Sequence, residues 1–203
     1  MPAALEAITT RERILELTDR LFYRQGIRSV TVDHIAAELG ISKKTLYRFF
    51  PSKSDLIVAY LKGRFRPLPT RTDRHPAQQI LENFDYFARS MVAGRADRGC
   101  AFANAIVELG EDESEARALA MEFKDARRLW FRDRLAQLDV DDPDTLANQL
   151  ALLIDGAYSA ALVRNDSAMT QAAVAAARTL LKNAGVPIAD FPVRTAALAS
   201  EAP

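Results

Sequence analysis

The chain is poor in the residues that mark several large classes of protein. It holds one cysteine and two histidines among 203 residues, and its 27 basic side chains balance 27 acidic ones. A disulfide framework needs many cysteines, and intrinsic disorder needs low hydrophobicity with a large net charge, so neither class fits. No apolar run approaches the roughly 20 residues of a membrane helix, and residues 1–10 lack the pattern of a signal peptide. We therefore expect a soluble protein of the cytoplasm.

Residues that break helices are also scarce. The chain has eight glycines and nine prolines, few for an all-β protein, and it is rich in alanine, leucine, arginine and glutamate. This composition favours an all-α fold. Apolar residues recur at helical spacing and predict about nine helices. These lie near 10–25, 32–39, 43–50, 53–65, 80–91, 102–109, 113–138, 145–163 and 169–184.

Charge and proline divide the chain into regions. Residues 1–66 carry 12 basic and 7 acidic side chains, a net charge of +5, so the remainder carries −5. Prolines at 67, 69 and 76 follow directly. We predict a domain boundary there, with an N-terminal domain at 1–66, a C-terminal helical bundle at 67–186 and a tail at 187–203. The charge difference suggests that only the first domain meets a polyanion.

A helix-turn-helix is predicted for residues 31–50. Two short helices flank Gly40-Ile41-Ser42, in which the glycine can adopt the positive φ of a tight turn. Thr31 and Ser42 are placed to cap the two helices, and Ser52 is placed in the same way before the helix that follows.

One face of the helix at 43–50 is expected to meet DNA. On a helical wheel Leu46, Phe49 and Phe50 share the buried side. The opposite side presents Lys44, Tyr47 and Arg48, with Lys43 at its rim. Lysine and arginine neutralise phosphates and bond to guanine edges, and a tyrosine hydroxyl can donate to a phosphate oxygen. Thr31 and Lys53 lie at helix N-termini, where free N–H groups favour an anion.

The same segment resembles a known family. The sequence TVDHIAAELGISKKTLYRFF at 31–50, followed by PSKSDL, is similar to the DNA-binding region of the tetracycline-repressor (TetR/AcrR) family of transcriptional regulators. The resemblance is close over about residues 9–60, and the rest agrees in helix number, length and order. It implies an all-helical homodimer with an N-terminal three-helix DNA-binding domain. It also implies a larger C-terminal domain that holds an effector pocket and dimerises through its last two long helices, at about 145–163 and 169–184.

The resemblance also implies roles for particular residues. The DNA-binding residues expected by position are Thr31, Ser42, Lys43, Lys44, Thr45, Tyr47, Arg48 and Lys53. Phosphate contacts are expected from Thr31, Tyr47 and Lys53. The residues expected nearest to the bases are Lys43, Lys44 and Thr45. Phe49 stands where many members have histidine, and Lys44 stands where smaller residues are frequent, so the base preference cannot be copied from a relative.

Candidates for other sites are fewer. Six bulky side chains are candidates for an apolar effector cavity, with ordinary core packing as the alternative for each: Phe84, Phe87, Met91, Phe102, Trp130 and Tyr158. Cys100 follows Gly99 near a helix start, where a thiol could sense oxidants, and the alternative is a small buried hydrophobe. His34 and His75 have no ligand-like spacing to the cysteine, so we expect no metal site and no cofactor.

The leading hypothesis is a sequence-specific transcriptional regulator, most simply a repressor that a small-molecule effector releases from its pseudo-palindromic operator. An ordinary solvated face is the alternative for the basic residues. An enzyme is the rival class, but the chain has no G-x-S-x-G, no H-E-x-x-H and no phosphate-cradling glycine loop. We therefore expect no catalysis. A helical ligand-binding or partner-binding module without DNA function remains a third possibility, which duplex binding by the purified protein would separate from the first.

Overall fold

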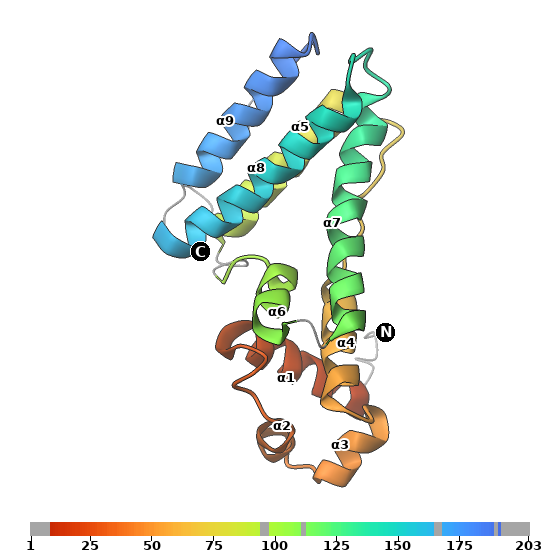
Figure 1. Cartoon of the computed structure of the whole chain (residues 1–203), viewed down its shortest axis with the longest axis vertical. Helices are drawn as coiled ribbons and strands as arrows, with labels where there is room; N and C mark the ends of the chain where they lie inside the picture. Colours follow the sequence, from red (N-terminus) through yellow and green to blue (C-terminus); the bar gives the residue numbers. More distant parts are fainter. Residues whose placement is uncertain (1–8, 94–97, 111–112, 165–167, 189–190, 192–203) are drawn as a thin grey trace, which may run out of the picture. The chain divides into compact units, whose positions relative to one another are not determined.

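The all-α fold expected from the composition is confirmed. A computed structural model describes residues 9–93, 98–110, 113–164, 168–188 and 191, and within these ranges the chain forms nine helices and no strand. The helices are α1 (Thr10–Gln25), α2 (Val32–Leu39), α3 (Lys43–Phe49), α4 (Lys53–Arg64), α5 (Pro76–Val92), α6 (Ala101–Leu109), α7 (Ser114–Leu135), α8 (Pro143–Arg164) and α9 (Ala168–Asn183) (Figure 1). None of them is long and apolar enough to cross a membrane.

The ends of the first helices follow capping rules. Glycines end α1 and α2, Gly26 with a φ of 91° and Gly40 with a φ of 66°, and this positive range favours glycine. Thr31, Ser42 and Ser52 each accept a hydrogen bond from a backbone N–H in the first turn of the next helix. The predicted caps are therefore confirmed.

Helix α7 is shorter than its hydrophobic pattern predicts. The periodicity indicates a helix over 113–138, whereas α7 ends at Leu135. The next turn is tighter, because the N–H groups of Gln137 and Leu138 bond to carbonyls three residues back, at 3.1 and 3.0 Å. Asp139 then has a φ of 49° and ends the turn. Periodicity does not distinguish such a turn from α-helix.

The chain forms two compact units. Unit 1 comprises residues 1–66 and 101–121, and unit 2 comprises residues 67–100 and 122–203. Helix α6 and the first turns of α7 therefore belong to the same unit as α1 to α4. The composition gave no sign of this grouping, because α6 follows the proline-rich segment and resembles the helices after it.

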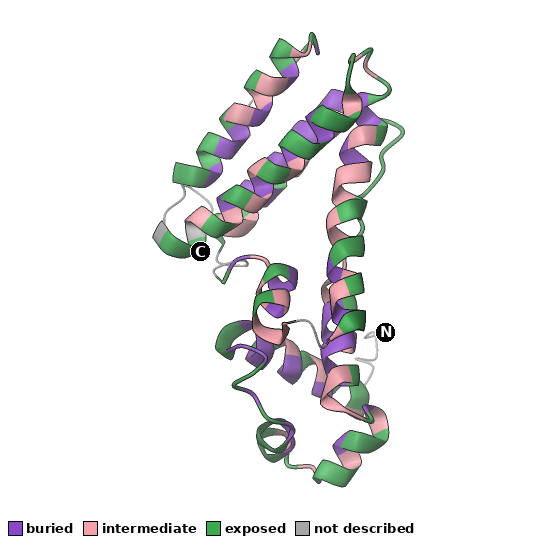
Figure 2. Cartoon of the chain, in the orientation of Figure 1, coloured by how far each residue is buried: buried purple, intermediate pink, exposed green. Residues whose placement is uncertain are grey.

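Unit 1 is built around fully buried aliphatic side chains. The largest are Ile14 of α1, Ile35 of α2, Leu46 of α3 and Leu56, Ile57 and Leu61 of α4. Figure 2 shows these helices buried on one side and exposed on the other. Phe22 of α1 meets Tyr60 of α4 edge-on, with ring centroids 5.5 Å apart. Because Leu46 is buried completely, its contacts determine which side of α3 faces outward.

Unit 2 has a separate core made by α5, α8, α9 and the second part of α7. Phe84 stacks on Phe131 with ring centroids 5.9 Å apart, and Phe87 meets Tyr158 edge-on at 4.7 Å. Several alanines of α8 and α9 are buried in this core: Ala147, Ala157, Ala173 and Ala177. These small side chains serve packing within the chain.

Candidate nucleic-acid interface

The turn between α2 and α3 is fixed by backbone hydrogen bonds. The N–H of Gly40 bonds to Ala37 O at 3.1 Å, and the N–H of Ile41 bonds to Ala36 O at 3.0 Å, which satisfies the last carbonyls of α2. A Cβ at Gly40 would meet no atom within 4 Å, so the positive φ alone explains the glycine. This turn sets the direction in which α3 leaves α2.

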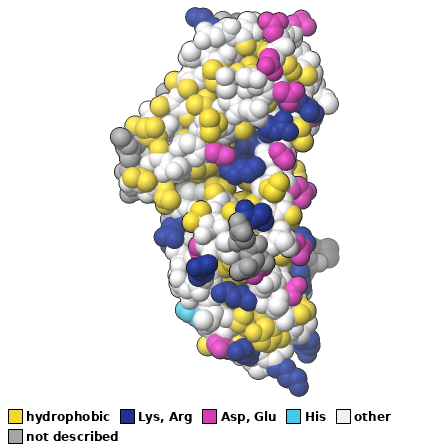
Figure 3. Space-filling model, in the orientation of Figure 1, with side chains coloured by type: hydrophobic (Ala, Val, Ile, Leu, Met, Phe, Trp, Pro, Cys, Tyr) yellow, Lys and Arg dark blue, Asp and Glu magenta, His cyan; other side chains and the backbone are white. Residues whose placement is uncertain are grey.

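The exposed face of α3 carries the predicted cations. Lys43, Lys44 and Arg48 are exposed, and Tyr47 is 37% exposed. Leu46 and Phe50 are buried as the helical wheel predicts. Figure 3 shows lysine and arginine side chains at the end of unit 1 that holds α3. The protein therefore presents a cationic helix face supported by an apolar core.

Two hydroxyl groups beside this face also act as caps. Thr31 Oγ1 accepts from the N–H of His34 at 3.1 Å, and Ser42 Oγ accepts from the N–H of Thr45 at 3.0 Å. Ser42 Oγ also lies 2.8 Å from Thr45 Oγ1, so one of the two hydroxyls donates to the other. Thr31 only accepts in its capping bond, so its hydroxyl proton can still be donated to a phosphate.

Lys43 and Lys44 differ in their partners. The ammonium of Lys43 lies 2.9 Å from Oδ1 and 3.1 Å from Oδ2 of Asp33 on α2, and this hydrogen-bonded carboxylate raises the pKa of Lys43. Lys44 makes no hydrogen bond or ion pair with any residue that the structure describes. Sequence reasoning missed Asp33. Ten positions separate the acid from the lysine, so only the geometry of the turn brings them together.

Lys53 points toward the core of unit 1. Its ammonium donates to the backbone carbonyl of Ile27 at 2.6 Å and lies 5.9 Å from the ring centroid of Phe22. Burial lowers the pKa of Lys53. The side chain ties the start of α4 to the connection between α1 and α2. The ammonium keeps two further donors, and the phosphate contact expected of Lys53 stays a prediction.

Acidic residues of α6 and of the segment that starts α7 contact α4 and the connection between α1 and α2. Glu108 accepts from the N–H of Arg28 at 3.1 Å, Ser54 donates to Glu113 at 2.8 Å, and Lys62 pairs with Glu115 at 3.1 Å. These partners lie 53 to 80 positions apart in the chain. No local signal in the sequence could have found them.

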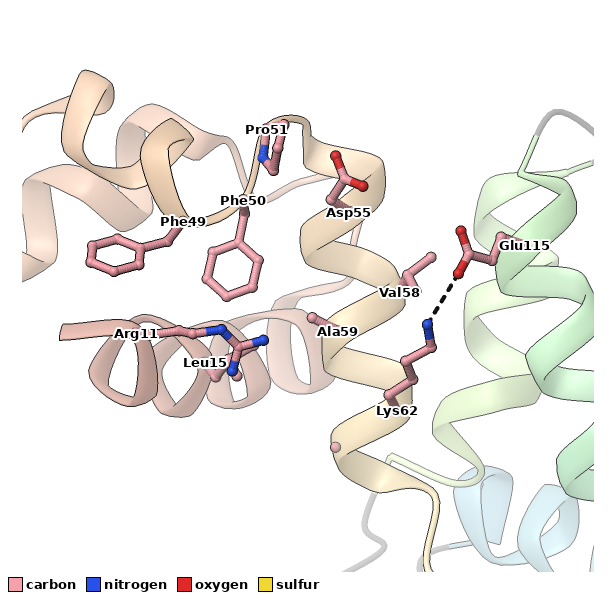
Figure 4. A pocket seen from close by; sticks show the side chains of 11 residues that line it. Arg11, Leu15, Phe49, Phe50, Pro51, Asp55, Val58, Ala59, Lys62 and Glu115 are labelled. Carbon is pink, nitrogen blue, oxygen red and sulfur yellow. Dashed lines mark hydrogen bonds and ion pairs between the residues drawn. The ribbon is translucent and has the colours of Figure 1, made fainter. Parts of the chain in front are cut away.

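A groove of about 500 Å³ lies within unit 1 between α1, α4 and the end of α3 (Figure 4). Its lining includes Arg11, Leu15, Phe49, Phe50, Lys62 and Glu115. The guanidinium of Arg11 lies 5.1 Å from the ring centroid of Phe50. Phe49 borders the groove and is therefore only half-buried, although the helical wheel places it on the core side.

Five of the six effector-pocket candidates lie in unit 2. Phe84, Phe87 and Trp130 are buried there, and Met91 and Tyr158 are partly buried against the same cluster. Phe102 lies in unit 1, where its ring meets Phe65 edge-on at 6.3 Å. The structure therefore does not place all six candidates in one cluster.

Polar groups beside the aromatic cluster were not anticipated. Arg127 Nη1 is buried in unit 2 and lies 3.6 Å from Oδ1 of Asp155, a longer distance than a hydrogen bond. Burial raises the pKa of Tyr158 on the same helix as Asp155.

Cys100 is a free, half-buried thiol. The described residues contain no cluster of three or more histidine, cysteine, aspartate or glutamate side chains that could hold a metal ion.

Comparisons with known proteins agree with this geometry. The profile of the family described as bacterial regulatory proteins, tetR family, matches residues 14–60. An HTH-type transcriptional regulator of Staphylococcus aureus (strain bovine RF122 / ET3-1) is 47% identical over 101 residues, which are 47% of this chain and 55% of that protein. A similar regulator of strain USA300 is 45% identical over the same length. The chain thus spans about half the length of the curated relatives it matches.

Solved structures extend the similarity to both units. A TetR-type transcriptional regulator from Streptomyces avermitilis is 32% identical with a TM-score of 0.78, and the match covers 88% of this chain and 100% of that one. A TetR-family regulator from Streptomyces coelicolor is 29% identical with a TM-score of 0.74, covering 86% and 95%. The resemblance seen in the helix-turn-helix sequence is therefore confirmed, and the chain belongs to the TetR family of helix-turn-helix, DNA-binding transcriptional regulators.

Proposed function

We propose that the protein is a repressor that binds a pseudo-palindromic operator as a homodimer and leaves it when a small molecule binds unit 2. One observation carries the DNA-binding part of this proposal. Lys44, Tyr47 and Arg48 project from α3 on the side opposite the fully buried Leu46. A short helix held in this way can enter a major groove with its cationic face leading. No catalytic role belongs to this proposal, and we place the protein in the cytoplasm, where bacterial DNA lies.

The side chains around α3 divide by the chemistry they offer. Thr31 and Tyr47 have hydroxyl groups that can donate to phosphate oxygens. Lys43, Lys44 and Thr45 occupy the first turn of α3, the part of a recognition helix that lies nearest to base edges. Lysine can donate to O6 and N7 of guanine. Arg48 is one turn further on and can neutralise a phosphate.

We infer that the dimer forms through α8 and α9, and exposed apolar residues support the α8 part of this interface. Leu152 is 71% exposed and Val163 is 83% exposed, and they lie about three turns apart on the same face of α8. Exposed apolar patches of this kind mark protein interfaces. We expect Leu152→Glu with Val163→Glu to give monomers in light scattering and to weaken operator binding. The matched control is Val107→Glu, which changes an equally exposed valine of α6 in unit 1. Equal loss of the dimer in both proteins would contradict the assignment.

The aromatic cluster of unit 2 is the proposed effector site. An effector releases the operator only if it binds the DNA-free conformation more tightly, because a ligand shifts a conformational equilibrium only by its difference in affinity. A coupling of about 1–3 kcal/mol would change operator affinity by roughly 5–150-fold. Arg127 and Asp155 beside the cluster, and the hydroxyl of Tyr158 within it, would add polar specificity to an apolar site.

Selection of bound sequences from a random duplex pool tests the proposed function. We expect enrichment of a pseudo-palindrome whose half-sites are about 10–10.5 base pairs apart, or a multiple of that spacing. Failure to enrich any sequence would favour a helical ligand-binding or partner-binding module without DNA function.

A further inference from the structure

An acidic side chain stands within the cationic surface around α3. Asp33 lies in the first turn of α2, and its side chain is 68% exposed. Both of its carboxylate oxygens lie within 3.1 Å of the ammonium of Lys43, whose side chain is 52% exposed. The same ammonium lies 6.0 Å from the ring centroid of Tyr47, one turn along α3. Lys43 is therefore held between an acid of α2 and a phenol of α3.

Fold stability does not explain this pair. Ion pairs between exposed side chains contribute little to stability, because water and salt screen them. The Asp33 carboxylate does interact favourably with the positive N-terminal end of α2, but that interaction does not require Lys43. Near DNA the carboxylate is a liability, since phosphates within a Debye length of about 10 Å at 0.1 M salt repel it. Pairing with Lys43 removes that repulsion and also restricts the ammonium.

We propose that Asp33 is a positioning residue for sequence recognition: it holds the Lys43 ammonium so that a remaining N–H reaches a base edge and not the nearest phosphate. The inference rests on the proposed DNA binding. A lysine ammonium has three donors on a flexible stem, and beside DNA an unrestrained one is drawn to phosphates, which carry no sequence information. The hydrogen bond to Oδ2 and the close approach of Oδ1 restrict the ammonium, so that a remaining N–H has a defined direction and can donate to guanine O6 or N7.

The test compares Asp33→Ala with the unchanged protein in selection from a random duplex pool. Alanine is chosen because asparagine could still accept a hydrogen bond from the ammonium. We expect Asp33→Ala to lose base preference at one symmetric pair of positions. Its affinity ratio for operator over random duplex should fall at least about fivefold, the lower range for one lost base contact. The slope of log affinity against log salt should steepen by about 0.9 for each freed lysine, or about 1.8 per dimer.

Two further variants make the test specific. Glu38→Ala removes the same charge from the same helix, but Glu38 pairs with His34 and Arg20 and not with Lys43, so its selected sequence should stay unchanged. Lys43→Ala should lose preference at the same positions as Asp33→Ala, and the double variant should lose no more.

Several results would overturn the inference while leaving DNA binding intact. An unchanged selected sequence and salt slope in Asp33→Ala would do so, and so would an equal change in Glu38→Ala. Losses at different positions in Asp33→Ala and Lys43→Ala would show that Asp33 contacts a base itself, since a carboxylate can accept from cytosine N4. If the unchanged protein selects no sequence, the proposed function fails together with the inference.

Discussion

Units 1 and 2 use their conspicuous side chains in opposite ways. Unit 1 exposes lysine, arginine and tyrosine on α3 and buries the aliphatic Leu46 beneath them. Unit 2 buries its large aromatics against one another, with Arg127 and Asp155 beside them. An exposed cationic face suits a polyanion, whereas a buried aromatic cluster suits a small apolar ligand. This difference is the reason for placing the two partners of the proposed repressor in different units.

The largest expected difference between the two units is in how salt concentration changes the affinity for their ligands. If 6–10 phosphates are neutralised per dimer, operator affinity should fall about 10³–10⁵-fold between 50 and 200 mM salt, because bound cations release counterions from the DNA. Effector binding to unit 2 should change far less over that range, since buried groups are screened less. Fluorescence anisotropy with labelled duplex and calorimetry with an effector measure the two responses. A flat salt response of operator binding would break the comparison.

Loss of the Lys44 side chain should have the next largest effect, on discrimination between duplexes. Lys44→Ala should reduce discrimination between the operator and a duplex with one changed base pair by about 1–3 kcal/mol, the value of one good base contact. Competition binding against single-substitution operators measures this loss. Arg48→Ala provides the comparison, because a phosphate contact should weaken all duplexes alike. A uniform loss in both variants would remove the division between base and phosphate contacts.

Lys53→Ala should act mainly on the stability of unit 1. The variant loses the hydrogen bond to the carbonyl of Ile27 and leaves that acceptor without its partner, which costs about 1–3 kcal/mol. Binding to operator and random duplex should weaken together, because the connection before α2 loosens. Urea unfolding followed by duplex binding measures both effects. Unchanged stability with weaker binding to every duplex would instead support the phosphate role expected from the sequence.

The contrast between Lys44, which is exposed as predicted, and Lys53, which points toward the core, shows what the sequence could predict. The caps at Thr31 and Ser42 and the turn at Gly40 depend on neighbours within a few residues, so the helix-turn-helix and its exposed face followed from local patterns. The hydrogen bond of Lys53 joins residues 26 positions apart, and that of Glu108 joins residues 80 positions apart.

Long-range packing also limited what could be inferred about the effector site. Phe102 shares helical periodicity with the other aromatic candidates, yet it lies in unit 1. Composition cannot assign a helix to one unit or the other, because an apolar face does not specify which other helices it packs against. The charged groups of Arg127 and Asp155 could not be predicted either, because they lie on different helices and only packing brings them together.

Alkaline pH should give the smallest effect and act on both units. Burial raises the pKa of Tyr60 in unit 1 and of Tyr158 in unit 2 above the ordinary value of 10.0. Above pH 10 the unfolded chain loses these protons while the folded chain keeps them, so the folded state binds more protons and stability falls as the pH rises. The slope is at most about 1.4 kcal/mol per pH unit for each tyrosine.

The variants Tyr60→Phe and Tyr158→Phe assign this loss to one unit or the other. Each should flatten the fall in unfolding free energy above pH 10, as measured by urea titration at several pH values. Lys53 acts in the opposite sense, because burial lowers its pKa and the folded chain releases its proton first. Its contribution is present in both the unchanged protein and Tyr60→Phe, so the difference between them isolates the tyrosine. Identical pH profiles for all three proteins would show that neither hydroxyl stays protonated through burial.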